Sequence, residues 1–302
     1  MAAAAALLFT PLTANEMLER GLRVLGVGME AQARRLATTN EKDFESHFGS
    51  RPTVIADLWN RLHTTATGVP LLPGKHFPSD FLVALHWLRI YPTEKERKIS
   101  LHIGEKTGRK WSWLYAKKIA ALKEELIQWP ADWGERIFTV SVDGVHFRIE
   151  EPPYPTYKRD KQHFSHKFGR AGLDYEIAIS IFESKVVWIN GPFKAGKHDV
   201  RIFKEDGLMQ LIPQGKRVIA DRGYCGAAEV VSYRNDLDTE EVKEFKRRAL
   251  SRHENFNNRI HTFKSLQELF RHSHEKHGIA FDTVVVICQL ELLLNASPLF
   301  DV

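Results

Sequence analysis

The spacing of apolar residues changes near Arg136, and this change limits the possible folds more than any other feature. Before it, apolar residues recur every three or four positions, which is the period of a helix with one buried face. From residue 137 to residue 144 the set Ile137, Thr139, Ser141 and Asp143 alternates with the set Phe138, Val140, Val142 and Gly144. This two-residue repeat, with its β-branched side chains, is typical of a strand. The chain is therefore expected to begin as a helical protein and to continue as a sheet.

Further strands and helices follow this first strand. Tyr175–Phe182 and Lys185–Ile189 are predicted to form a hairpin at Glu183-Ser184, and Arg217–Asp221 a fourth, short strand. Helices are expected after Asp238-x-x-Glu241 and from about Phe281 to Leu294. Three strands, a fourth strand and then helices predict an α/β (α+β) mixed sheet with helices packed on it, and an RNase H-like fold has that order.

The region before Arg136 is predicted to be helical throughout. Apolar residues at helical spacing, namely Leu18, Leu22, Leu25, Met29 and Leu36, indicate one amphipathic helix before Pro52. A loop rich in Gly and Pro, Gly68–Pro78, separates this segment from three helices. We expect these helices at Pro78–Ile90, after the capping-box pattern Thr93-x-x-Glu96, and at Arg109–Trp129.

Basic residues are concentrated in the second and third of these helices. Between residues 94 and 123 there are nine Lys or Arg (95, 97, 98, 106, 109, 110, 117, 118, 123) and three Glu (94, 96, 105), an excess of six. A helix, a turn and a basic helix are the outline of a helix-turn-helix DNA reader. A solvated three-helix bundle explains the pattern equally well. The expected domains are a helical segment (1–74), a helix-turn-helix-like DNA-binding region (75–134) and a catalytic domain (135–302).

Composition indicates a folded protein without a membrane span or a disulfide framework, but it does not identify the function. With 302 residues and 43% hydrophobic composition, the chain is long enough for two folded domains. A sequence pI of about 9.1 is compatible with a polyanionic partner. The two cysteines, Cys225 and Cys288, form neither a disulfide framework nor a zinc motif and are expected to be buried in a reducing compartment. We expect neither a membrane span nor a signal peptide, since the apolar start Met1–Leu8 lacks a basic segment.

Two aspartates follow apolar strand segments and stand next to glycines. Asp143 is expected at the end of its strand before Gly144, and Asp221 precedes Arg222-Gly223, where glycine permits close backbone approach. A carboxylate in such a position gains nothing from core packing, so a cleft position is expected. Taken singly, either acid is better explained by a surface or capping role, and only the combination of the two favours a cleft.

Converging carboxylates repel each other unless a cation compensates their charge. Oxygen ligands with open coordination positions favour Mg²⁺ or Mn²⁺ over Zn²⁺. In two-metal phosphodiester chemistry both ions need protein anchors, which a third carboxylate from a helix would complete. Glu254, 33 residues beyond Asp221, is the candidate. It points away from the apolar stripe of its helix, so either that helix is irregular near Ser251 or its polar face looks into the cleft.

The motifs around these acids resemble those of the DDE-type transposases of the PIF/Harbinger and IS5-like group. Val142-Asp143-Gly144-Val145-His146 is similar to their "DGTH" element, and Asp221-Arg222-Gly223-Tyr224 to their "D-x-G-Y" element. The spacing from Asp221 to Glu254, the loop Gly196-Lys197-His198-Asp199 and the C-terminal tail also resemble that group. The resemblance covers the chain from about Phe138 to its end and extends more faintly back to Phe44.

The resemblance implies a function and a set of ligands. Asp143, Asp221 and Glu254 would be the catalytic metal ligands for Mg²⁺ or Mn²⁺, in a domain that cuts DNA and joins 3′ ends to a target. It also implies transposon-end and target DNA as partners, a separate Myb-like DNA-binding protein and a homo-oligomer on DNA. The expected location is the nucleus in a eukaryote and otherwise the cytoplasm. Alternatives are a domesticated, inactive DNA-binding protein and a nuclease acting on RNA or hybrids.

Several basic residues are candidates for DNA contacts. They lie in the predicted third helix and in an aromatic-rich loop after Asp143, and they are Arg109, Lys110, Lys117, Lys118, Lys158, Arg159, Lys161 and Lys167. A second group, Lys194, Lys197, Arg201 and Lys204, fits either phosphate binding or an ordinary surface. The histidines show no metal-binding spacing. A hydrogen-bonding or packing role is expected for His146 and His198, and a solvated helix end around His277.

Overall fold

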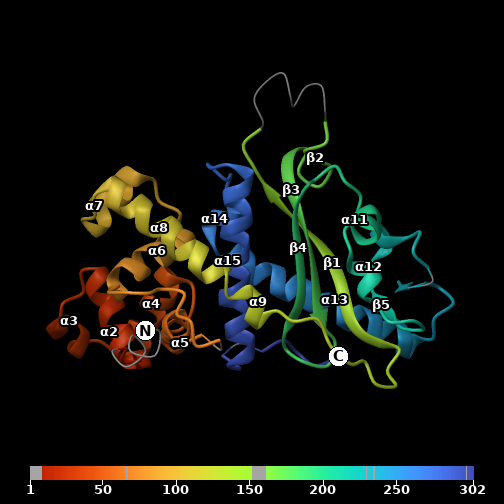
Figure 1. Cartoon of the computed structure of the whole chain (residues 1–302), viewed down its shortest axis with the longest axis horizontal. Coiled ribbons are helices and arrows are strands. Elements are labelled where there is room, and N and C mark those ends of the chain that lie inside the picture. The colour runs from red at the N-terminus through yellow and green to blue at the C-terminus, as the bar shows by residue number, and fades with distance from the viewer. Residues whose placement is uncertain (1–8, 66, 152–160, 229, 234, 297) are drawn as a thin grey trace. The chain divides into compact units, whose positions relative to one another are not determined.

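The computed structural model describes residues 9–65, 67–151, 161–228, 230–233, 235–296 and 298–302. The chain divides into two compact units (Figure 1). The first comprises Met1–Leu126, Thr262–Ser265 and Ile279–Ser297, and the second comprises Ile127–His261, Leu266–Gly278 and Pro298–Val302. The apolar start at residues 1–8 and the predicted DNA contacts Lys158 and Arg159 lie outside the described residues.

The first unit is built from helices. They are α2 (Ala14–Val24), α3 (Met29–Arg34), α4 (Ala37–Phe48), α5 (Pro52–His63), α6 (Pro78–Ile90), α7 (Glu94–Leu101), α8 (Glu105–Ala120), α9 (Lys123–Leu126) and most of α15 (His274–Leu293). Every side chain from Phe81 to Leu88 of α6 is buried. A helix that is apolar on all sides is stable only inside a core, so α6 lies at the centre of this unit.

The prediction of one long N-terminal helix is wrong. The segment before Pro52 forms α2, α3 and α4, and the chain leaves the helical conformation after α2, where Gly26 has φ 80°. This left-handed backbone costs glycine little and ends the helix. Met29 and Leu36, which continue the apolar spacing in sequence, are 71% and 73% exposed. Apolar spacing alone does not detect such a break.

Two of the three helices expected next are confirmed, and the third has different bounds. Helix α6 spans the predicted residues, and α7 begins with both hydrogen bonds of the Thr93–Glu96 capping box. Helix α8 begins four residues earlier than predicted and ends at Ala120 instead of Trp129. The short connection 102–104 and a buried contact, in which Arg97 Nη1 donates to Ser112 Oγ over 2.6 Å, hold α7 against α8.

The C-terminal helix α15 begins earlier than predicted, at His274, and packs into the first unit. Thr283 Oγ1 donates to the carbonyl of Ala116 over 2.8 Å, and Gln289 Nε2 donates to that of Leu126 over 2.9 Å. The division by contacts therefore differs from the boundaries expected at residues 74 and 134. Sequence order cannot show this difference, because the helix that completes the first unit comes last in the chain.

The second unit contains one mixed sheet. Its strands are β1 (Phe138–Arg148), β2 (Phe164–Ser165), β3 (Arg170–Ser180), β4 (Val186–Lys194), β5 (Arg217–Ile219) and β6 (Val231–Ser232), in the order β2-β3-β1-β5-β6, with β4 also paired to β3. β1, β3 and β4 are antiparallel neighbours, whereas β1, β5 and β6 run parallel. This arrangement confirms the mixed α/β class and the predicted hairpin, although the hairpin strands are longer and β2 and β6 were not expected.

Helices cover the two faces of this sheet. On one face, Phe203 of α11 (Asp199–Glu205) and Leu208 of α12 (Leu208–Leu211) share a core with Val142 and Ala178. On the other face lies α13 (Glu240–His261), whose Ala249 packs against Ile219. The short elements η1 (Arg222–Tyr224) and α14 (Lys264–Gln267) complete the described structure. Side chains alternate along β1, so each face receives every second residue of this strand.

Two smaller expectations can also be compared with the structure. Cys288 is buried as expected, but Cys225 is exposed because it follows η1 in a surface turn. Among the described residues, no helix combines the length and apolar character that crossing a membrane would require.

Candidate active site

The register of β1 and β5 places the two predicted aspartates side by side. Ser141 pairs with Ile219 in the parallel ladder, and Asp143 and Asp221 each stand two residues further along. Asp143 lies in the middle of an 11-residue strand and not at its end, which corrects the prediction. β5, however, ends at Ile219, so Asp143 lies beyond the last paired residue of its neighbour. Asp143 therefore has no paired neighbour on the β5 side, because β5 ends before it and not because β1 does.

The two aspartates differ in environment. Burial and the negative charge of Asp221 together raise the pKa of Asp143 to about 7, while a hydrogen bond from the Gly144 amide and the charge of Lys167 oppose this rise. Asp221 is exposed, and its Oδ1 accepts a hydrogen bond from the amide of Gly223 over 2.7 Å. Two carboxylates whose charges interact, one of them half-buried, are an arrangement that a bound cation stabilises.

Glu254 lies on α13, the helix that contacts Asp143, but among the described residues it does not form a group of closely spaced ligand atoms with Asp143 and Asp221. His253 Nε2 lies 3.0 Å from Ser141 Oγ, and Asn257 Nδ2 approaches Asp143 Oδ2 to 3.5 Å. Glu254 precedes Asn257 by one helical turn and is exposed. Because α13 is continuous from residue 240 to residue 261, the irregular-helix alternative is wrong. The residues of α13 that meet β1 are the buried His253 and the half-buried Asn257, whereas Glu254 is exposed.

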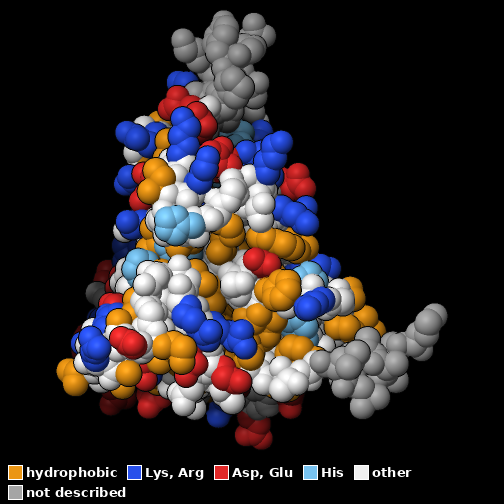
Figure 2. Space-filling view, turned by 90° about the vertical axis from the view of Figure 1, so that its left-hand side faces the viewer, with side chains coloured by type: hydrophobic (Ala, Val, Ile, Leu, Met, Phe, Trp, Pro, Cys, Tyr) orange, Lys and Arg blue, Asp and Glu red, His pale blue; other side chains and the backbone are white. Residues whose placement is uncertain are grey.

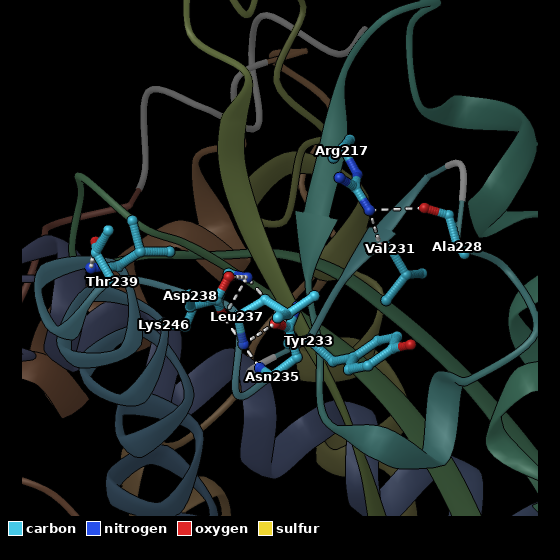
Figure 3. A network of polar contacts seen from close by, with 10 residues as sticks. Arg217, Ala228, Val231, Tyr233, Asn235, Leu237, Asp238, Thr239 and Lys246 are labelled. Atoms are coloured by element: carbon cyan, nitrogen blue, oxygen red, sulfur yellow. Dashed lines mark hydrogen bonds and ion pairs between the residues drawn. The ribbon is translucent and has the colours of Figure 1, made fainter.

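Arg217 fixes the strand from which Asp221 extends. Its guanidinium donates to the carbonyls of Ala228 and Val231, each over 2.6 Å, and so joins β5 to the segment leading into β6 (Figure 3). Hydrogen bonds from a charged donor to carbonyls are stronger than neutral ones. This clamp keeps the connection after Asp221 close to the sheet.

Lys246 fixes the beginning of α13 in a similar way. Its ammonium is 4% exposed and donates to Asp238 over 2.9 Å and to the carbonyl of Tyr233 over 3.1 Å (Figure 3). The helix begins at Glu240, two residues after Asp238, which the sequence pattern proposed as its first cap. Arg217 and Lys246 together anchor both parts of the segment between Asp221 and Glu254.

A second acidic group, which the sequence reasoning missed, lies beside these residues. One ligand atom from each of His146, Asp174 and Asp199 lies within 4.8 Å of the others, and no further group of this kind occurs among the described residues. His146 Nε2 is 3.6 Å from Asp174 Oδ1. His146, expected only to pack or to make a hydrogen bond, is thus part of a candidate metal group. Two acids within the apolar run of β3, at positions 174 and 176, were the signal that could have revealed it.

Burial dominates the electrostatics of this second group. Burial first, and then the charge of Asp199, raise the pKa of Asp174 to about 9 and that of Glu176 to about 8. The pKa of Asp199 itself is raised by burial and by Asp221. Burial lowers the pKa of His146 to about 4, which favours the neutral imidazole that can bind a metal.

The predicted DNA-binding residues fall into three sets. Arg109 forms an ion pair with Glu94 over 2.5 Å, and Lys110 lies 4.5 Å from the ring centre of Trp111, so both have partners within their own unit. Lys117, Lys161 and Lys167 are exposed, and Lys118 is half-buried. Lys167 belongs to the predicted set, and its charge lowers the pKa of Asp143. Lys158 and Arg159 belong to the part of the chain that the structure does not describe.

The basic residues do not form one continuous patch on the face shown in Figure 2, where Lys and Arg side chains are dispersed among acidic and hydrophobic ones. In the group after β4, Lys197 pairs with Asp206 over 2.6 Å and Arg201 with Glu205 over 3.1 Å. These pairs favour the surface interpretation for Lys197 and Arg201.

A mixed sheet with carboxylates at neighbouring parallel strands, and a group of His146, Asp174 and Asp199 beside them, defines an α/β protein with an acidic candidate metal centre. Residues 142–290, about half of the chain, match the model of the family described as DDE superfamily endonuclease. This part of the chain therefore belongs to the DDE superfamily endonucleases, which confirms the recognition from sequence at that level. Membership of this family implies a nuclease that acts on DNA. A comparison with curated proteins finds no match.

Proposed function

We propose that the chain is a transposon-derived DDE transposase of the PIF/Harbinger and IS5-like group, with an RNase H-like catalytic domain. It cuts DNA strands and transfers 3′ ends to a target. The parallel register that brings Asp143 beside Asp221, with Asn257 of α13 3.5 Å from Asp143, is the observation that carries this proposal. All three acids of the expected pattern are present, so the inactive DNA-binding protein is the second choice.

The residues fit a hard divalent cation. Asp143 is half-buried, its pKa is raised to about 7, and its partner is another carboxylate. Asp143, Asp221 and Glu254 supply only oxygen ligands, which suits Mg²⁺ or Mn²⁺. When bound, such ions activate the attacking oxygen and stabilise the leaving oxygen of a phosphodiester.

The chain's own residues position this chemistry. Asn257 donates to Asp143 Oδ2 and leaves Oδ1 for other partners, and the amide of Gly223 orients the Asp221 carboxylate. Lys167 lies near enough to lower the pKa of Asp143 and can neutralise a phosphate that approaches the acids. Exposed Asp221 and Glu254 leave the site open to a long polymer.

The first unit is the proposed DNA-binding part. In helix-turn-helix proteins the second helix reads the major groove, and α8 would take that role after the short connection 102–104. Lys106, Lys110 and Lys117 are exposed on α8. Because Arg109 is already paired with Glu94, it contributes to DNA binding only if that pair opens. Transposon-end and target DNA, a Myb-like protein and further copies of this chain are the proposed partners, in the nucleus of a eukaryote or otherwise the cytoplasm.

Plasmid nicking by the purified full-length chain tests the proposal. With Mg²⁺ or Mn²⁺ we expect cleavage that Asp143→Asn, Asp221→Asn and Glu254→Gln each abolish without loss of DNA binding. Glu244→Gln is the matched control, because Glu244 is an exposed acid on the same helix. If the chain binds DNA but does not cut it, even with its partner protein added, the domesticated DNA-binding protein is the better assignment. Cleavage of RNA or hybrids in preference to DNA would instead support the other nuclease.

A further inference from the structure

The second acidic group lies on the sheet face opposite to Asp143. Residues 141 and 143 of β1 face α13, as the contacts of Ser141 and Asp143 show. Gly144 and His146 are on the alternate face, where His146 pairs across the ladder with Asp174 and Gly144 with Glu176. Asp199 reaches this face from the first residue of α11. The group is therefore separate from the carboxylate pair of the proposed function.

Asp174 is the residue that this group leaves unsatisfied. It is 0% exposed, and neither of its carboxylate oxygens accepts a hydrogen bond of good geometry among the described atoms, although the backbone amide of Tyr175 lies near enough to lower its pKa. A buried carboxylate without a donor or a cation is costly. The atoms that face it, the Asp199 carboxylate and the Nε2 of His146, are ligand atoms rather than charged donors.

Ser165 orients the histidine for metal binding. Its Oγ lies 3.0 Å from Nδ1 of His146, so Nδ1–H can donate to the hydroxyl while the lone pair of Nε2 points toward Asp174. Metal-binding histidines generally have their second ring nitrogen held in this manner. Ligands about 2.0–2.2 Å from an ion lie roughly 3–4.4 Å apart, which agrees with ligand atoms that all lie within 4.8 Å.

Asp199 connects this group to the aspartate pair. A methyl group placed on Gly144 would lie 3.2 Å from Oδ1 of Asp199 and 3.5 Å from Oδ1 of Asp174. A methyl group on Gly223 would lie 2.6 Å from Oδ2 of Asp199 and 2.9 Å from Oδ1 of Asp221. The two oxygens of Asp199 therefore face different acids, and the two glycines leave the room for this approach.

We propose that His146, Asp174 and Asp199 form an inner binding site for a divalent transition-metal ion, and that Asp199 links this site to the Asp143–Asp221 pair. One imidazole nitrogen and two carboxylates favour an ion such as Mn²⁺ or Zn²⁺ over Mg²⁺, which prefers oxygen ligands and keeps its waters. The inner site does not depend on the proposed function. Without an ion, a proton on Asp174 shared with Asp199 would satisfy the same atoms, and this is the competing account.

Binding of Mn²⁺ to the full-length chain, followed by electron paramagnetic resonance of the free ion, separates these accounts. Protein stripped with a chelator and carrying Asp143→Asn should still bind one Mn²⁺ with an affinity that excess Mg²⁺ lowers only weakly. Adding Asp174→Asn should weaken this binding by about tenfold or more. Asp206→Asn, which removes an acid paired with Lys197 outside the group, is the matched control and should leave the binding unchanged.

His146→Gln provides a second variant in case Asp174→Asn does not fold, since the side chain of His146 is 18% exposed. It should weaken Mn²⁺ about tenfold and Mg²⁺ much less, because only the softer ion gains from the imidazole. The proposal is overturned if Asp143→Asn protein binds no Mn²⁺, or if folded His146→Gln protein binds it unchanged. Retained Mn²⁺ binding in a chain that never cuts DNA would refute the proposed function and leave the inner site standing.

Discussion

The two faces of the sheet carry acids in contrasting settings. On the α13 face, Asp143 contacts Asn257 and lies beside exposed Asp221, so its carboxylate group is within reach of solvent and substrate. On the α11 face, Asp174 is fully buried, and its neighbours are His146 and Asp199. An open acidic site suits an ion that must exchange ligands with a substrate, whereas a closed one suits an ion that stays in place. The same strand β1 serves both.

The largest expected effect is the loss of stability when the buried ring of Phe147 in β1 is removed. Phe147 is fully buried, and its ring centre lies 5.6 Å from that of Tyr175 and 5.5 Å from that of His277. Phe147→Ala should lower the free energy of unfolding by about 3–5 kcal/mol, as measured by urea denaturation. Leu237→Ala, at a residue 97% exposed, should change it by less than about 0.5 kcal/mol. Equal effects of the two substitutions would contradict the assigned core.

The next largest effect compares how substitutions on the two faces of the sheet change the rate of DNA cleavage. Glu254→Gln should lower the rate of DNA cleavage by about 100-fold or more, because it removes a proposed ligand on the open face. Ser165→Ala, which only removes the hydroxyl that orients His146, should lower the rate by less than about tenfold. Single-turnover cleavage with Mn²⁺ measures both. A larger effect of Ser165→Ala would reverse the assignment of the two faces.

Acid should lower the stability of the folded chain because His277, which contacts Tyr175 of β3, is buried in its neutral form. Its Nδ1 lies 2.7 Å from the hydroxyl of Tyr175, and burial lowers its pKa to about 3. The unfolded chain takes up this proton near pH 6.5, whereas the folded chain resists it until about pH 3. Stability should therefore fall with decreasing pH in this range, by up to about 1.4 kcal/mol per pH unit. His253, with a pKa lowered to about 3, adds an effect of the same sign.

Urea denaturation of His277→Gln at several pH values tests this contribution, and the slope should become shallower than that of the wild-type chain. His166→Gln, at an exposed histidine, should keep the wild-type slope. An unchanged slope in His277→Gln would show that the ring is not held neutral. The expectation of a solvated helix end around this residue is already wrong, because His277 is 0% exposed.

The smallest effect concerns the contact between α13 and Asp143. Asn257→Ala removes a long hydrogen bond of 3.5 Å, so we expect a loss of about 0.5–1.5 kcal/mol in stability or transition-state binding, corresponding to roughly a two- to tenfold slower cleavage. Asn258→Ala, at an exposed neighbour, is the matched control for this rate measurement. A loss as large as that of Glu254→Gln would place Asn257 among the ligands.

The contrast between the faces also explains what the sequence could reveal. Asp143 and Asp221 were recognisable because each follows an apolar strand and stands next to a glycine, and the hairpin and the capped helix α7 follow from local patterns. The inner group was not recognisable, because His146, Asp174 and Asp199 meet only through the pairing of β1 with β3 and the packing of α11. Likewise, the place of α15 in the first unit depends on contacts between distant segments.

Anomalous scattering from crystals of the chain soaked in Mn²⁺ tests the central claim most directly, because it locates the ions relative to the sheet. We predict one peak between Asp143 and Asp221 on the α13 face and a second among His146, Asp174 and Asp199 on the α11 face, with Asp199 adjoining both. A single peak, or a second peak away from His146, would contradict the account of two linked sites.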